Sequence, residues 1–457
     1  MTLALLTALV VAQADGGLLA DGGVPPPPGW LAWKPALSAD DYARKKEGWY
    51  VTGLPIFNYD PNTGVGLGAR GYLFFDGKRS DELFAYEPYR HRMFVQAFFS
   101  TKGLQYHVLD YDAPFFLGTP FRLRAEAGYI RAQTTPYFGR GEATLQPLTF
   151  KGRTYAWFND YERAVSAVQP DGTTYGLYDF VDAEKPYLDV RLERQFFEGR
   201  VRLLGGLTFS RGAMRFIQPG TIINAYDDDG RKVEAPLGAS RLADDCATGR
   251  LVGCGGGWDN QLTLGVSYDT RDFEPDPNSG VFHEASIQVA TKAIGSEYDY
   301  VRFTGALRGY YSPFPEWADL VLAGRFTMML QTSGVPLFAM QQIPFLETFT
   351  LGLGGNRTLR GYRSMRFVAA NMVFTNLEAR WTFVRFQALS QQWGLIFAPF
   401  FDSGSVFDRV DRIRLGDWKY SAGAGLRISW NQATILMCDV GLSREDWGIY
   451  LNFGHIF

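Results

Sequence analysis

The chain has 457 residues, of which 46% are hydrophobic, 16% aromatic and 20% charged, and it contains 51 glycines. This composition excludes a disordered chain and is sufficient for one large β domain. The net charge of -3 gives no overall basic signature, so we expect no binding to nucleic acid.

The N-terminal residues 1–14 form a short apolar run that ends in Ala12-Gln13-Ala14. A small-x-small pattern after an apolar run is typical of a signal peptide, and it predicts export of the chain. No Lys or Arg precedes Lys34, so an apolar strand or a wrongly set start codon stays open as the alternative. Residues 15–48 are rich in Pro, Gly and charge, which predicts an extended periplasmic linker.

The chain from Trp49 to Phe457 is predicted to consist of β-strands. Beyond residue 14 there is no apolar run of about 18 residues, so no transmembrane helix is predicted. Many segments alternate with period two instead. In one of them an apolar face opposes a polar face of Gln261, Thr263, Ser267 and Asp269; the apolar residues are Leu262, Leu264, Val266 and Tyr268. A soluble antiparallel sandwich shows the same alternation, so periodicity alone does not decide between the two.

Three features favour a transmembrane antiparallel β-barrel, an all-β fold. Many strands reach about 10 to 13 residues, which is enough to cross a bilayer obliquely. Aromatic residues gather at strand ends, where a membrane interface favours them. Short turns alternate with the long loops 132–183, 215–258 and 332–366, an asymmetry typical of membrane barrels.

The number of strands is predicted to be even and about 16. Five are expected in the N-terminal third, although Tyr155 to Tyr161 could be another and 49–58 could be none. Six are expected between 184 and 331. Five more follow the last long loop, and the last of them is expected at 446–457.

The C-terminal segment alternates Trp447, Ile449, Leu451, Phe453, His455 and Phe457. It resembles the terminal strand of bacterial outer-membrane barrels, whose final aromatic residue is part of the assembly signal. The resemblance implies that Phe453 and Phe457 serve as that signal.

The stretch GLGGNRTLRGYRSMRF, residues 352–367, places glycines and arginines between two predicted strands. Together with Phe401-Asp402-Ser403-Gly404 and Asn376-Leu377-Glu378-Ala379-Arg380, the tetrapeptide Leu359-Arg360-Gly361-Tyr362 resembles the barrel of the BamA/TamA superfamily. Two further segments, Tyr268 to Gly280 and Tyr137 to Gly141, occur in the same order as in that family. The resemblance covers residues 49–457.

This resemblance implies that residues 359–362 fold into the lumen as a plug and that the barrel handles protein or lipid. Members of the family usually carry periplasmic polypeptide-transport-associated domains before the barrel. The segment 15–48 is too short to hold one, which leaves the family's best-known activity open for this chain.

An arginine inside the lumen needs anionic partners, because an unpaired charge in a confined site is unfavourable. Glu378 and Asp402 are the candidates for Arg360. Glu378 alternates with the apolar residues around it and should face inward, whereas Asp402 shares its face with Ala398 and Phe400.

Two cysteines, Cys246 and Cys254, flank a short segment of a predicted outer loop, where an oxidising environment favours a disulfide. Cys438 lies on an apolar strand face and is expected to be a free, lipid-facing thiol.

No motif for catalysis, a cofactor or a metal is found, so we expect no enzyme activity and no cofactor. Gly352, Gly354 and Gly355 lack the strand-helix context of a phosphate-binding loop. The four histidines are scattered, and no GxSxG motif occurs. The acidic run Asp227 to Asp229 lacks the spaced ligands of a calcium loop.

Two classes of function remain. The first is an outer-membrane barrel of a Gram-negative bacterium that assists insertion or translocation of protein or lipid through the seam between its first and last strands. The second is a porin-like channel or a structural surface protein on the same scaffold. Expected partners are outer-membrane lipids, the barrel assembly machinery during biogenesis, and a client that the sequence does not identify.

Overall fold

The computed structural model describes residues 26–457 except for 61–63, 275, 389–390, 413 and 432–433. The predicted signal peptide, residues 1–14, lies outside the described residues. No helix among the described residues is long and apolar enough to span a membrane.

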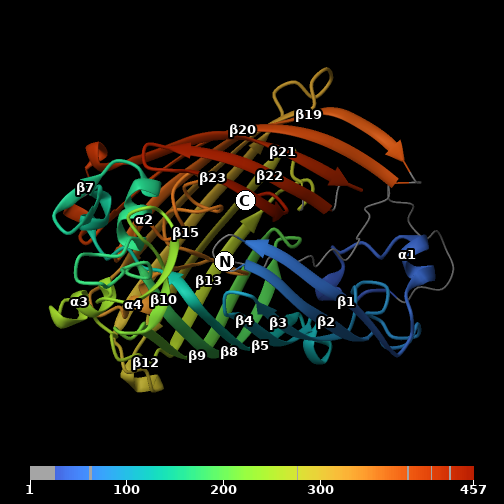
Figure 1. Cartoon of the computed structure of the whole chain (residues 1–457). Coiled ribbons are helices and arrows are strands. Elements are labelled where there is room, and N and C mark those ends of the chain that lie inside the picture. The colour runs from blue at the N-terminus through green and yellow to red at the C-terminus, as the bar shows by residue number, and fades with distance from the viewer. Residues whose placement is uncertain (1–25, 61–63, 275, 389–390, 413, 432–433) are drawn as a thin grey trace.

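Sixteen long strands form one antiparallel meander in which each strand pairs with the next (Figure 1). The fold is therefore all-β, as predicted, and the two-residue strand β12 (Gly257–Trp258) brings the sheet to 17 strands. The long strands are β1 Trp49–Asp60, β2 Gly64–Phe75, β3 His91–Ser100, β4 Leu104–Ala113, β5 Phe121–Pro136, β8 Phe180–Phe196, β9 Val201–Phe216, β13 Gln261–Asp269, β14 Gly280–Ala290, β15 Tyr300–Tyr311, β16 Leu320–Gln331, β19 Asn371–Ala388, β20 Gln391–Phe407, β21 Lys419–Trp430, β22 Thr434–Ser443 and β23 Trp447–Phe453.

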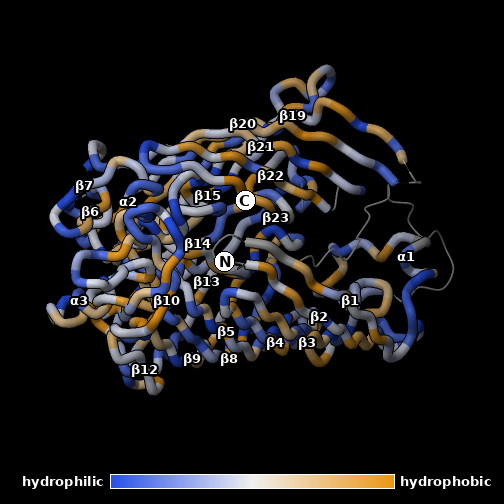
Figure 2. The backbone as a smooth tube through the Cα atoms, in the orientation of Figure 1, coloured by the Kyte–Doolittle hydropathy of each residue, from blue (hydrophilic) through white to orange (hydrophobic). Residues whose placement is uncertain are grey.

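The strands present one apolar face outward and one polar face inward, and Figure 2 shows the alternation along the tube. In β15, for example, Leu307 is 53% exposed, whereas the neighbouring Arg308 is 7% exposed. This is the reverse of a soluble sheet, in which the apolar face is the buried one. The apolar outer wall is what a lipid-facing barrel requires.

The two ends of the barrel differ. One end, here called the loop end, carries three long connections between strands, and each connection holds one short helix and one short hairpin (Figure 1). The helices are α2 Phe158–Ser166, α3 Arg241–Ala247 and α4 Leu337–Met340. The hairpins are β6 Leu148–Phe150 with β7 Arg153–Tyr155, β10 Ile222–Tyr226 with β11 Lys232–Pro236, and β17 Gln342–Pro344 with β18 Phe349–Leu351. Most of the apolar core lies there, among α4, the segment 353–370 and the inner side of β19. The opposite end, which carries α1 (Ala39–Arg44), is here called the α1 end.

One segment that could have been a strand is a helix. The stretch from Tyr155 to Tyr161 leaves β7 and enters α2, which buries Phe158, Tyr161 and Val165. These three residues pack against Phe138 and Phe150 in the loop-end cap. Residues 155–161 therefore belong to the loop-end cap, although their alternating pattern was also compatible with a strand of the barrel wall.

The segment before β1 contains two short helices, which corrects the predicted extended linker over residues 26–48; residues 15–25 lie outside the described residues. Within it, residues 29–31 form a 3-10 helix and α1 follows, capped by Ser38, whose hydroxyl accepts from the Asp41 amide at 3.1 Å. Leu31 is buried against residues of the β2–β3 loop. Contacts that are distant in sequence stabilise these short helices, and composition does not reveal such contacts.

The first and last strands are not joined. Among the described residues, no backbone register pairs β1 with β23, and Figure 1 shows them on the two sides of an opening in the sheet. Each of the two strands pairs on one side only. We call these two unpaired edges the seam.

Candidate functional site: the Arg360 loop and the seam

The segment 352–367, here called the Arg360 loop, is a tight hairpin inside the barrel. A bridge between Leu353 and Phe367 closes its base, and the Gly355 amide donates to the Tyr362 carbonyl at 3.0 Å. Gly354 has a φ of +113°, and a Cβ there would lie 2.0 Å from the Arg363 oxygen. Gly354, and Gly355 with a φ of +86°, are therefore required by this turn.

Arg360 is fully buried at the tip of the Arg360 loop and bonds to three strands. Its Nε and Nη2 donate to the two oxygens of Asp402 on β20, both at 2.8 Å. Its Nη1 donates to Glu378 on β19 at 2.8 Å and to Asp439 on β22 at 2.6 Å. The guanidinium also lies 3.3 Å from the centre of the Phe400 ring, so Phe400 covers its face.

Two further arginines complete the charge balance around Glu378. Arg427 on β21 donates to both Glu378 oxygens, at 3.0 and 2.7 Å, and Arg380 on β19 donates at 2.8 Å. The cluster thus contains three arginines and three carboxylates, and each carboxylate accepts from at least one arginine. Paired charges of this kind fix the geometry of a loop in a confined site.

The tip of the Arg360 loop is attached to the last two strands. The hydroxyl of Tyr450 on β23 accepts from the Gly361 amide at 2.8 Å, and the Ser443 hydroxyl donates to the Gly361 carbonyl at 2.8 Å. A Cβ on Gly441 of β22 would lie 2.7 Å from the Arg360 backbone carbon, so the loop backbone rests directly on that glycine. These contacts place the Arg360 loop on the β23 side of the seam.

The C-terminal residues turn inward, which corrects the predicted strand 446–457. β23 ends at Phe453, whose side chain lies outside the described part of the structure, and Gly454 follows with a φ of +76°. Arg380 donates to the backbone oxygen of Phe457, and Arg325 donates to that of Ile456. The alternating pattern of the sequence continues past Gly454 and so predicted a longer strand. In the structure the residues after Gly454 instead bind the inward-facing arginines Arg325 and Arg380.

The side chains of His455 and Phe457 are also held by residues of the barrel. The ring nitrogen Nε2 of His455 lies 2.8 Å from Asp276, and its Nδ1 contacts Arg427. The Phe457 ring stacks on Tyr310 of β15 and lies 5.1 Å from the guanidinium groups of both Arg325 and Arg380. The tail therefore occupies the lumen beside the arginine cluster.

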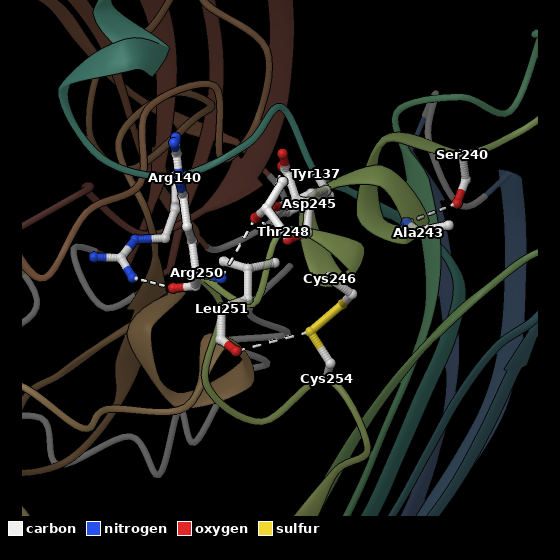
Figure 3. Close-up of a disulfide and its surroundings, with 10 residues drawn as sticks. All are labelled: Tyr137, Arg140, Ser240, Ala243, Asp245, Cys246, Thr248, Arg250, Leu251 and Cys254. Carbon is white, nitrogen blue, oxygen red and sulfur yellow. Dashed lines mark hydrogen bonds between the residues drawn. A yellow bond between two sulfur atoms is a disulfide. The ribbon is translucent and has the colours of Figure 1, made fainter.

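At the loop end, a disulfide joins Cys246, in α3, to Cys254 (Figure 3). The same region is tied to the barrel by the Tyr137 hydroxyl, which donates to Asp245 at 2.7 Å. Cys438 is a free, exposed thiol on the outer face of β22, beside Leu436 and Val440.

A second cluster of charged groups lies at the α1 end. Lys45 Nζ donates to the backbone oxygens of Phe84 and Glu87 at 2.6 and 2.7 Å. Burial raises the pKa of Glu87 to about 7 and that of Asp76 to about 6, and nearby Lys45 opposes both shifts. Burial also lowers the pKa of Lys45 to about 8. This cluster joins the segment before β1 to the β2–β3 loop.

The structure brings together all six residues that the sequence singled out for the loop: Leu359, Arg360, Gly361, Tyr362, Glu378 and Asp402. Sequence reasoning missed Asp439, Arg427 and Tyr450 as partners. A signal for Asp439 existed, since it opposes the lipid-facing Cys438 and Val440 in an alternating strand. No sequence pattern in the Arg360 loop or in β23 indicated that the two would be in contact.

The arrangement is suited to holding a loop. Among the described residues, no group of three or more His, Cys, Asp or Glu side chains is placed to hold a metal ion. The acidic groups of the Arg360 cluster are engaged by arginines. The groups that remain available to bind another molecule are the backbone N–H and C=O groups along the unpaired edges of β1 and β23 at the seam.

Comparisons with known proteins agree with this architecture. The Omp85 superfamily domain matches residues 200–438, and a domain of unknown function (DUF5982) matches residues 28–90. A search of curated protein sequences gave no match. Among solved structures, BamA from Haemophilus ducreyi lacking POTRA domains 1-3 is similar over 90% of this chain and 70% of that chain, with 13% identity and a TM-score of 0.51. CdiB from Escherichia coli is similar over 90% of this chain and 62% of that chain, with 11% identity and a TM-score of 0.48.

Proposed function

Because the chain belongs to the Omp85 superfamily, whose barrels are bacterial outer-membrane proteins, we propose that it assists insertion or translocation of protein or lipid at the outer membrane of a Gram-negative bacterium. The observation that carries the proposal is the seam. A membrane barrel must satisfy its backbone polar groups internally, and unpaired edges of β1 and β23 leave such groups available to a client strand or a lipid headgroup.

The position of the Arg360 loop supports the same role. It is bonded to β19, β20, β22 and β23 and fills part of the lumen at the loop end. A filled lumen hinders diffusion through the barrel and leaves the seam as the accessible route. We therefore propose that the barrel conducts ions poorly and that the client is handled at the seam.

We place the α1 end in the periplasm and the loop end outside the cell. Residues 1–14 would then be a signal peptide, residues 49–457 the barrel, and residues 15–48 would lie in the periplasm. The disulfide Cys246–Cys254 supports export of the chain, because disulfides persist in oxidising surroundings. The proposed partners are outer-membrane lipids, the assembly machinery that inserts the barrel, and a protein or lipid client.

Site-specific photo-crosslinking in living cells tests the seam. A photo-reactive residue at Val51 of β1 or Ile449 of β23, which are 73% and 53% exposed, is compared with one at Leu264 of β13 or Leu307 of β15, which are 60% and 53% exposed. We expect adducts with newly made protein at the two seam positions only; membrane lipid contacts all four outward positions, so lipid adducts are not scored. Equal labelling at the four positions would contradict the proposal.

Planar-bilayer recording separates this function from that of a porin-like channel. The purified barrel should show low conductance, because the Arg360 loop and the C-terminal tail occupy the lumen. Deletion of the gene should change the protein or lipid composition of the outer membrane. A large, steady conductance with an unchanged membrane composition would favour the channel.

A further inference from the structure

The outer wall carries a hollow of about 620 Å³ that the seam and the Arg360 loop do not use. One register row crosses five strands there: Val95 pairs with Leu109, Leu109 with Ala127, Ala127 with Leu188, and Leu188 with Phe209. The large members of the row are 37 to 58% exposed. Ala127 in its centre is the small residue that makes the wall concave.

The width of the wall at the hollow accommodates acyl chains that lie side by side. Five neighbouring strands at about 4.8 Å spacing span about 19 Å, which is wider than one extended acyl chain. The flanking Leu109 and Leu188 form the sides. Several acyl chains side by side would restore the apolar contacts that a flat wall makes with lipid.

The loop end of the hollow carries polar and aromatic groups at one level. Tyr129 lies two residues beyond Ala127 on β5, and Arg211 lies two residues beyond Phe209 on β9. Arg211 pairs in register with Trp258, which also lines the hollow. Tyrosine and tryptophan at one level of the outer wall mark the boundary between acyl chains and headgroups.

Arg211 is exposed at this boundary and has no acidic partner among the described residues. By contrast, Arg131 and Arg215, the next outward arginines toward the loop end, contact Asp182 or Glu184. An arginine at the headgroup level without a carboxylate partner is suited to a lipid phosphate, which guanidinium binds with two parallel hydrogen bonds.

We propose that this hollow is a binding site for a lipid with several acyl chains and a phosphorylated headgroup, whose phosphate binds Arg211 and whose chains fill the space over Ala127. The apolar lining alone would accept any membrane lipid, whereas Arg211 adds selectivity for the phosphate. The site lies on β3 to β9, so it is independent of the function proposed for the seam.

Native mass spectrometry of the delipidated protein in detergent tests the proposal, with diphosphoryl lipid A as the probe. We expect saturable binding of one lipid. Loss of one charge-assisted contact should weaken it about tenfold, both in Arg211→Gln and when the probe lacks its phosphates. Removing the phosphates should have little further effect on the Arg211→Gln variant.

Matched variants separate this site from general lipid contact. Ala127→Trp fills the hollow and should abolish saturable binding. Ala379→Trp, at another outward position, and Arg444→Gln, at an exposed arginine in the β22–β23 turn, should bind as the wild type does. Heat-modifiable migration in electrophoresis confirms that each variant is folded, and Arg211→Gln keeps the test decisive should Ala127→Trp misfold.

Several outcomes would overturn the proposal. They are equal affinity for the probe without phosphates, equal loss in the two control variants, and competition by inorganic phosphate alone. Phosphatidylglycerol, with two chains, should bind more weakly than lipid A, and equal binding would overturn the assignment of a many-chain lipid. A dimer that excludes the probe would show that a second copy covers the hollow.

Discussion

Gly361 and Gly441 approach so closely that neither has room for a side chain. A Cβ on Gly441 would lie 2.7 Å from the backbone carbon of Arg360, and one on Gly361 would lie 2.7 Å from that of Leu442. The tip of the Arg360 loop and strand β22 thus touch through their backbones, and this contact aims the Arg360 side chain at its three carboxylates.

Gly441→Val should displace the Arg360 loop from β22. Crowding of this kind typically costs about 1–3 kcal/mol, so we expect lower stability in urea unfolding from lipid vesicles and a higher conductance in planar bilayers. Gly309→Val is the matched control, because a Cβ on Gly309 of β15 meets no atom within 4 Å. Equal effects of the two substitutions would show that the contact with β22 does not position the loop.

Arg360→Met should destabilise the barrel by roughly 3–5 kcal/mol, because it leaves three buried carboxylates with fewer cationic partners. Arg385→Met breaks the pair with Asp319, whose side chains are 53% and 34% exposed, and should cost about 1 kcal/mol or less. Urea unfolding of both variants in vesicles measures the difference. A loss for Arg360→Met no greater than that for Arg385→Met would contradict a stabilising role of the cluster.

The Cys246–Cys254 pair should resist alkylation in the absence of reductant, so that mass spectrometry finds one modified cysteine, Cys438, after denaturation. Closing so short a segment stabilises the cap by roughly 2–3 kcal/mol in the chain-entropy description. Reduction should therefore speed proteolysis within residues 241–256 and leave the barrel wall protected. Three alkylated cysteines without reductant would refute the disulfide.

Docking of α1 should weaken as the pH rises toward neutrality. Glu87 and Asp76 have folded-state pKa values of about 7 and 6, above the ordinary values of 4.5 and 3.8, so their contribution is present at low pH and is lost as the pH rises through those values. Lys45, lowered to about 8, acts in the opposite sense, and docking strengthens again between about pH 8 and 10.5.

Hydrogen exchange of residues 39–48, corrected for the intrinsic rate, should show the least protection between pH 7 and 8. Glu87→Gln should reduce the change between pH 5 and 7. A protection profile that is flat from pH 5 to 8 in the wild type would show that these groups do not control docking of α1.

Phe457→Ala should lower stability and slow assembly, because the ring stacks on Tyr310 and lies beside two guanidinium groups. The proposed assembly signal requires Phe453 and Phe457 to be accessible before the tail enters the lumen. Pulse-chase assembly compared with unfolding of the purified variant separates these roles. A variant that is destabilised but assembles at the wild-type rate would leave only the packing role.

The wall of the barrel was predictable because each strand repeats the same physical requirement of an apolar side toward lipid and a polar side toward the lumen. That pattern located 15 of the 16 long strands, left 49–58 open, and placed Glu378 inward. Asp402 was ambiguous, because Phe400 shares its face, and the structure resolves this by packing Phe400 on the Arg360 guanidinium.

The remaining features depend on contacts that are distant in sequence. α1 is a single short helix, and its docking rests on Lys45 and on residues of the β2–β3 loop. The inward turn at Gly454 was hidden because a glycine fits an alternating strand as well as it fits a turn. The hydrogen bond between the Gly361 amide and the Tyr450 hydroxyl depends on the position of the Arg360 loop in the lumen, and no local sequence pattern predicts that position.

The attachment of the Arg360 loop makes the two borders of the seam mechanically unequal. β23 is braced from inside by Tyr450, and β22 by Gly441 and Asp439, so this border moves together with the loop and the strands that hold it. β1 pairs with β2 alone, and Val51 and Phe57 project from it with 73% and 68% exposure. Of the two borders of the seam, β1 is therefore the less constrained, and β23 is the one that the Arg360 loop holds in place.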